Sequence, residues 1–369
     1  MSFGTKPTLL TAALLAATSI ACGADLTDAN DSDTDDLSDT TYSMEMVRAN
    51  PALLPSVQVV DARKVTGHGR PGAQADVAHT NFQGGGWDAA WLYDANGLGQ
   101  FKNLADPAVH KDDKATATYA RKPGDLFAAD GKLVWTNVAQ GGLGDCYFAA
   151  SLASTLLADK GGDLTKNMIV PVIEKGKVVS YKVTFFQASG RKVAIEVDPD
   201  LPHSVATGDV FYMSSTDNAP GYEEWAPSLI EKAYAKWHRS YNAIGNGGTA
   251  ADALYALGGK TTKQYAAKSA TVVAAIDKAA KANKAQVACT YGEKDGVKYD
   301  GTGVYADHCY TLRGIEKKDG KTFVMLRNPW GPWHDTEPSG PGSDGVQDGL
   351  FSLELSVFQT LYLDVSIVP

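Results

Sequence analysis

Residues 140–150, the stretch that decides the fold, read Gln-Gly-Gly-Leu-Gly-Asp-Cys-Tyr-Phe-Ala-Ala. The glycines permit a tight turn, and the apolar residues that continue through Leu157 predict a helix. Cys146 therefore opens a helix, where the dipole and the unpaired backbone N–H groups favour the reactive thiolate. Gln140 lies six residues earlier, so its amide and the Cys146 N–H can donate to one oxyanion. A lone cysteine in such a place is usually a small buried residue, but the glutamine, the glycines and the helix start together favour a nucleophile.

His308 is the best candidate for the base that a nucleophilic cysteine needs. It opens an alternating strand pattern that runs to Ile315, and the turn signal at 318–320 leads to a second strand that ends near Asn328. Antiparallel pairing would bring the start of the first strand beside the end of the second. Asn328 would then fix the direction of the imidazole, and Trp330 would shield their hydrogen bond from water.

Together these stretches resemble the calpain family of papain-fold cysteine proteases. The matching features are Gln-Gly-x-Leu-Gly-Asp-Cys, a strand opened by His, and Leu-Arg-Asn-Pro-Trp-Gly. Residues 225–236, Trp-Ala-Pro-Ser-Leu-Ile-Glu-Lys-Ala-Tyr-Ala-Lys, are similar to the long helix of that family. The likeness extends from about residue 126 to the C-terminus.

The resemblance implies an α+β fold, a papain-like core of two lobes. A helical lobe would carry Cys146, and a β-sheet lobe would carry His308 and Asn328. It also implies a role for each residue: Cys146 as nucleophile, His308 as general base, Asn328 as its orienting partner, Gln140 in the oxyanion hole and Trp330 as a supporting residue. The expected function is a cysteine endopeptidase that hydrolyses protein peptide bonds through an acyl-thioester. The alternative is a non-catalytic calpain-like module that binds protein and is displayed as a surface lipoprotein.

Four residues near the motifs leave alternatives open. Tyr147 stands where the family commonly has Trp, and Asp307 stands where calpains usually have Gly. Asp307 either tunes the imidazolium charge or faces solvent, and we favour solvent. Cys289 and Cys309 lie on separate predicted strands. They are either two buried free thiols, which we favour, or a disulfide of an oxidising compartment.

The expected reaction requires no cofactor, and calcium is the one metal that the resemblance raises. Glu223 matches one acidic ligand position of the animal calpain core, and no other position clearly matches. The acidic run at 31–36 starts like a calcium loop but lacks the required glycine and glutamate. Calcium dependence therefore rests on Glu223 alone.

Residues 1–21 predict a signal peptide, because a single charge, Lys6, precedes a short apolar stretch. Small residues before Cys22 resemble a bacterial lipobox, although Ser19 replaces its usual leucine. We favour lipidation of Cys22 over an ordinary secretory cleavage. The expected location is an exported lipoprotein anchored in a bacterial membrane, the outer one being favoured, or a secreted protein.

The remaining organisation follows from composition. Residues 22–45 predict an acidic disordered tether, with seven Asp between 23 and 41. Residues 46–125 form an N-terminal region of unknown role, for which a propeptide is one interpretation. The Cys-bearing lobe spans 126–255 and the His/Asn-bearing lobe 256–369. The net charge of −9 argues against nucleic acid, so the expected partners are protein or peptide substrates, bound by a monomer, and a membrane reached through the lipid.

Overall fold

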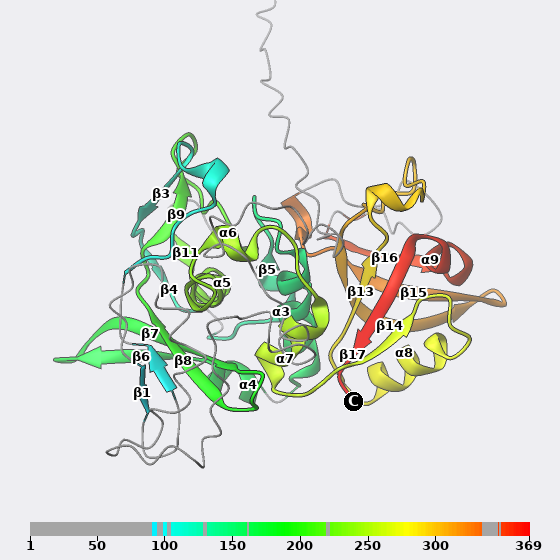
Figure 1. The fold of residues 1–369 in the computed structure, drawn as a ribbon, viewed down its shortest axis with the longest axis horizontal. Helices are drawn as coiled ribbons and strands as arrows, with labels where there is room; N and C mark the ends of the chain where they lie inside the picture. The colour runs from blue at the N-terminus through cyan, green and yellow to red at the C-terminus, as the bar shows by residue number, and fades with distance from the viewer. Residues whose placement is uncertain are drawn as a thin grey trace, which may run out of the picture.

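The computed structural model describes residues 91–93, 99–101, 105–127, 131–160, 162–218, 222–333, 346 and 348–369. The predictions for residues 1–45, including the signal peptide, Cys22 and the acidic tether, lie outside the described residues. Figure 1 shows two sheets on opposite sides of a group of helices, which agrees with the predicted α+β class. Among the described residues, none of the helices has the length and apolar character needed to cross a membrane.

The helices are α3 (Cys146–Ala158), α4 (Asp163–Met168), α5 (Ala226–Trp237), α6 (Tyr241–Ile244), α7 (Ala250–Gly258), α8 (Val272–Lys281) and α9 (Leu355–Leu361). The five-stranded sheet has the order β1 (Trp91–Tyr93), β2 (Gly99–Phe101), β8 (Lys192–Val197), β7 (Lys177–Phe186), β6 (Ile169–Glu174). The six-stranded sheet has the order β12 (Lys263–Ala266), β17 (Tyr362–Ile367), β13 (Gln286–Thr290), β14 (Cys309–Lys318), β15 (Lys321–Arg327), β16 (Leu350–Glu354). The short strands pair as β3 (Ala117–Ala120) with β9 (Leu201–Ser204), β4 (Gly124–Asp125) with β11 (Glu223–Glu224), and β5 (Val138–Ala139) with β10 (Ser214–Ser215).

Helix α3 is the central element of the fold. Its residues are apolar or small on every side, and all of them from Cys146 to Leu156 are buried; a helix with this pattern belongs in a core. It packs against α7 on one side and against β13 and β14 on the other. The first helical residue, Cys146, is thereby held at one end of the six-stranded sheet.

The six-stranded sheet is covered on both faces, and the two faces follow the period of two along each strand. Val287 and Cys309 belong to the core around α3, whereas Ala288 and Tyr310 belong to the core around α8. The sequence predicts that Val272, Ile276 and Ala280 of α8 face this sheet. Val272 and Ile276 are buried, and the half-buried Ala280 has its Cβ close to Gly314 of β14. The β14–β15 hairpin forms as predicted, with Asp319 and Gly320 at its turn.

The part of the chain that carries Cys146 is less helical than predicted. Besides α3 to α7 it contains the five-stranded sheet, whose strands β7 and β8 pack against α5. All twelve residues of α5 are buried, not only the apolar face that the i, i+4 spacing predicts. Its Lys232 ion-pairs with Asp198 at 2.8 Å and also with Asp106. The polar face of α5 is therefore covered by chain that the sequence assigned to the N-terminal region.

The close approach of Gly248 to the Tyr147 ring provides a test of how α3 is packed. A Cβ built on Gly248 would lie 2.4 Å from Cζ of the buried Tyr147 ring, too close for any real contact. Gly248→Ala should therefore lower the free energy of unfolding by about 1–3 kcal/mol, as overpacking does. Gly258→Ala is the matched control, because a Cβ at Gly258 meets nothing within 4 Å. It ends helix α7, so alanine should be neutral or stabilise by a few tenths of a kcal/mol. Urea unfolding measures both, and equal effects would contradict the packing described.

Candidate active site

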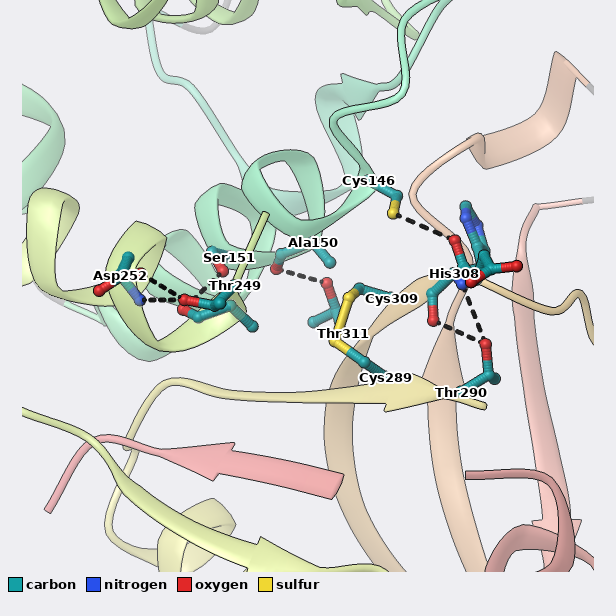
Figure 2. The surroundings of a disulfide bond; sticks show 12 residues. Cys146, Ala150, Ser151, Thr249, Asp252, Cys289, Thr290, His308, Cys309 and Thr311 are labelled. Carbon is teal, nitrogen blue, oxygen red and sulfur yellow. Dashed lines mark hydrogen bonds between the residues drawn. A yellow bond between two sulfur atoms is a disulfide. The ribbon is translucent and has the colours of Figure 1, made fainter. Parts of the chain in front are cut away.

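Cys146 and His308 come from different parts of the fold and meet at the end of the six-stranded sheet. Figure 2 shows the Cys146 side chain directed from the start of α3 toward the segment that carries His308. Cys146 Sγ lies 4.0 Å from the main-chain oxygen of Asp307, the residue before His308. Both Cys146 and His308 are buried. The structure therefore brings together the two residues that the sequence assigned as nucleophile and base.

The nucleophilic form of a cysteine is the thiolate. The chemistry considered for Cys146 therefore needs its sulfur in the reduced state.

Asn328 orients the imidazole of His308 as the hairpin register predicts. His308 Nε2 lies 2.9 Å from Asn328 Oδ1, so the ring donates from Nε2 and its Nδ1 is left for another partner. Burial lowers the pKa of His308 to about 4, and the hydrogen bond to Asn328 acts in the opposite direction. The ring is therefore neutral here, and a thiolate near it would favour the imidazolium.

Two aromatic rings cover the His308–Asn328 bond. The ring of Trp330 lies 4.5 Å from that of His308 between centroids, and the backbone N–H of Trp330 donates to Asn328 Oδ1 at 3.2 Å. Tyr305 packs on Trp330 with centroids 4.5 Å apart. This is the shielding position that the sequence assigned to Trp330, and Tyr305 is a second cover that the sequence did not indicate.

Thr290 fixes the backbone of His308, and no sequence pattern pointed to it. His308 N donates to Thr290 Oγ1 at 3.0 Å, and Thr290 N donates to His308 O at 2.9 Å. Thr290 ends strand β13, so the threonine ties the start of the base-bearing strand to its neighbour (Figure 2).

A disulfide joins the same two strands, and the expectation of two free thiols at Cys289 and Cys309 is wrong. The two residues are direct partners in the β13–β14 register and form a disulfide. The physical reason is this register, which sets their side chains opposite each other on the same face of the sheet. The bond lies beside His308 in Figure 2 and holds the base-bearing strand at its first residue.

Gln140 lies beside Cys146 in a turn held by both parts of the fold. Its Nε2 donates to Leu143 O at 2.6 Å, which leaves one N–H of the amide, and its backbone N donates to Pro329 O at 2.8 Å. A Cβ on Gly141 would lie 2.2 Å from the carbonyl oxygen of Tyr212. Only glycine therefore fits at that position of the turn.

Arg327 is the main residue that sequence reasoning missed. Its Nη2 donates to the carbonyls of Thr136 and Val138 at 2.9 and 2.7 Å, and its guanidinium lies 5.8 Å from the Trp135 ring centroid. The side chain is 1% exposed, so these bonds are made in a dry environment. The residue before Asn328 thus binds the strand that leads to Gln140.

Two further predictions have different outcomes. The carboxylate of Asp307 accepts a hydrogen bond from Glu293 N at 2.9 Å, so it holds the preceding loop and does not simply face solvent as we favoured.

Glu223, the residue considered for calcium, accepts a hydrogen bond from His203 Nε2 at 2.8 Å. Within the described residues no group of three acidic, His or Cys side chains could hold a metal, and calcium dependence stays a prediction.

The chain is similar in sequence to a known protein family and to several of its members. The model of the family described as calpain family cysteine protease matches residues 109–348. Calpain clp-4 of Caenorhabditis elegans is 30% identical over 244 residues, which is 62% of this chain and 32% of that protein. Calpain-B of Drosophila melanogaster is 30% identical over 249 residues, 62% of this chain and 25% of that protein. The calpain-type cysteine protease DEK1 of Arabidopsis thaliana is 29% identical over 58% of this chain and 10% of its own length. The chain thus spans a third or less of the relatives named here.

The contact of Arg327 leads to a prediction with a matched control. Arg327→Met removes the guanidinium donor from the carbonyl of the buried Val138 and from that of Thr136, which keeps Thr216 Oγ1 as a donor at 3.2 Å. The free energy of unfolding should therefore fall by about 2–3 kcal/mol. Arg313 lies against the same Trp135 ring at 5.6 Å and is partly exposed. Arg313→Met should therefore cost about 1 kcal/mol or less. Denaturant unfolding measures the free energy of unfolding of both variants. Similar decreases would mean that the hydrogen bonds of Arg327 to the carbonyls do not stabilise the fold beyond its contact with the Trp135 ring.

Proposed function

This chain belongs to the calpain family of cysteine proteases, and we propose that it is an active endopeptidase that cleaves protein chains. The observation that carries the proposal is the arrangement of Cys146 at a helix N-terminus beside His308, whose ring is oriented by Asn328. A module that only binds protein has no use for an oriented imidazole beside the thiol. We further propose a papain-like core of two lobes, with the reaction at their junction.

The proposed reaction begins with reduced Cys146 and proceeds in two steps. The thiolate attacks the peptide carbonyl, and the oxyanion accepts hydrogen bonds from the Cys146 N–H and from the remaining N–H of Gln140 Nε2. The imidazolium of His308 then protonates the leaving amine, and an acyl-thioester remains on Cys146. In the second step His308 takes a proton from water, which attacks the thioester and releases the acid and the thiol.

We propose that the protein acts outside the cytoplasm. The sequence of residues 1–22 favours export with lipidation at Cys22, and the Cys289–Cys309 disulfide supports an oxidising compartment. Replacement of Cys22 by Ala should move the protein from the membrane fraction to the soluble fraction if the lipid is its anchor.

A thiol-directed epoxide tests the nucleophile. In mildly reduced full-length protein, the epoxide should label Cys146 at least tenfold faster than any other cysteine, as mapped by peptide mass spectrometry. Among the described cysteines, only Cys146 opens a helix, where the dipole and the free N–H groups favour the thiolate. Casein cleavage should require the reductant and should fall by about 10³-fold or more in Cys146→Ala.

Two outcomes favour the binding module: labelling of Cys146 no faster than that of Cys289 and Cys309, or undiminished cleavage by Cys146→Ala. A chelator present in a parallel assay tests calcium, and unchanged activity would remove the role considered for Glu223.

Asn328→Ala tests the orientation of the base. The hydrogen bond to Asn328 favours the protonated ring, so its loss should lower the pKa of His308. The imidazolium that protonates the leaving amine is then lost at a lower pH. The alkaline limb of kcat/KM should therefore move to lower pH, and the maximum should fall by about 10²-fold because the ring is no longer held. An unmoved alkaline limb would mean that Asn328 does not act on the ionisation of His308.

A further inference from the structure

Asp145 and Glu231 form a buried carboxyl pair next to the nucleophile that the proposed reaction does not use. Asp145 directly precedes Cys146, and Glu231 lies in α5. Their side chains are 0% and 1% exposed, and they hydrogen-bond to each other. A carboxyl group in a dry environment needs a partner, and here the partner is a second acid.

The hydrogen bonds of the pair can be accounted for oxygen by oxygen. Glu231 Oε1 accepts from Met213 N at 3.0 Å. Within the described part of the chain, the other three oxygens have no hydrogen-bond donor on any residue outside the pair. Two carboxylates cannot hydrogen-bond to each other, because neither has a hydrogen to donate. The contact between Asp145 and Glu231 therefore requires a proton on one of them.

The surroundings supply no positive charge. Burial raises the pKa of both carboxyl groups. The contact between them raises the pKa of Glu231 further and lowers that of Asp145, so Glu231 is the proton donor of the pair. The other titratable groups that face the pair are tyrosines whose pKa is also raised by burial, and they stay neutral: Tyr147 in α3, Tyr234 in α5, Tyr119 in β3, Tyr212 in the segment before β10, and Tyr241 in α6. No cation among the described residues acts on either carboxyl group.

The position of Asp145 gives this proton a consequence for Cys146. Asp145 stands at the N-cap of α3, where an aspartate normally caps the helix through its carboxylate. Its side chain makes no such bond; only its main-chain oxygen accepts, from Phe148 N and Ala149 N at 2.8 and 3.1 Å. Without the proton from Glu231, an Asp145 carboxylate at this place would put a full negative charge beside the thiolate and compete for the same N–H groups.

We propose that Asp145 and Glu231 are positioning residues that hold a proton between them, and that this keeps the N-terminus of α3 available to the Cys146 thiolate and the oxyanion. Glu231 also holds Met213, whose neighbour Tyr212 packs on the Gly141 turn, so the pair supports the turn that carries Gln140. The proposal rests on the nucleophilic role of Cys146 described above.

Isosteric amides test the proposal, because each variant leaves the remaining charge at a different distance from Cys146. Asp145→Asn leaves one carboxyl group on Glu231, Glu231→Gln leaves it on Asp145, and the double variant leaves none. The measurement is the rate of Cys146 alkylation by iodoacetamide against pH in reduced full-length protein, resolved by peptide mass spectrometry. The thiol pKa in Glu231→Gln should exceed that in Asp145→Asn by about one unit, and the double variant should not exceed Asp145→Asn.

A merely structural role predicts a different result: all three variants would share one thiol pKa, and alkylation would change only with the unfolding temperature. That result overturns the proposal. Alkylation requires no peptide hydrolysis, so equal pKa values in an active protease would overturn this inference alone. A shifted pKa in a chain that cleaves no protein would overturn only the proposed function.

Infrared spectroscopy provides a second measurement that does not depend on the variants folding. Wild-type protein at neutral pH should show the C=O stretching band of a protonated carboxyl group, and the double variant should show a weaker one. If the wild type shows no such band, the proposal is overturned whatever the variants do.

Discussion

The burial of helix α3 against strands β13 and β14 is the constraint on which the rest of the structure depends. It places the first helical residue, Cys146, beside the segment that carries His308 and leads into β14 (Figure 2). Two side-chain contacts fix how the helix lies on the sheet. Thr311 Oγ1 donates to Ala150 O at 2.9 Å, and Ser154 Oγ donates to Gln286 O at 2.8 Å. A helix shifted by one residue would lose both bonds and turn the thiol away from the imidazole.

The polar groups of the site are buried, and burial makes the charged form of each group less favourable. Burial alone disfavours the imidazolium of His308, so the base depends on Asn328 and on the thiolate to become charged. Burial also disfavours carboxylates, and the Glu231 proton engages the carboxyl group of Asp145, which makes no bond to the helix N-terminus beside the nucleophile. Arg327 keeps its charge by donating to the Thr136 and Val138 carbonyls and so links the two parts of the fold. Because water is excluded, each of these bonds matters more than it would at the surface.

The sequence predicted the parts of the site that depend on local pattern. Cys146 was found because glycines, a glutamine and a helix start lie together within eleven residues, and His308 and Asn328 because a hairpin brings the ends of its strands together. Thr290 escaped prediction, and the Cys289–Cys309 disulfide was the less favoured of two alternatives. Both depend on which strand lies beside β14, and the sequence pattern does not give that pairing. Asp145 and Glu231 belong to two separate motifs, 86 residues apart in the sequence. Only the tertiary packing of α5 brings them together, and no single-sequence period reports that contact.

Trapping of the covalent intermediate is the direct test of Cys146 as the nucleophile of a peptidase. Reduced full-length protein would be mixed with an excess of a peptide ester, quenched in acid within milliseconds to seconds, digested, and mapped by mass spectrometry. If Cys146 is the nucleophile, the peptide acyl group should be found on Cys146, should accumulate before steady state, and should disappear at the rate of turnover. Turnover without an acyl group on Cys146, or with one on another residue, would show that Cys146 is not the nucleophile.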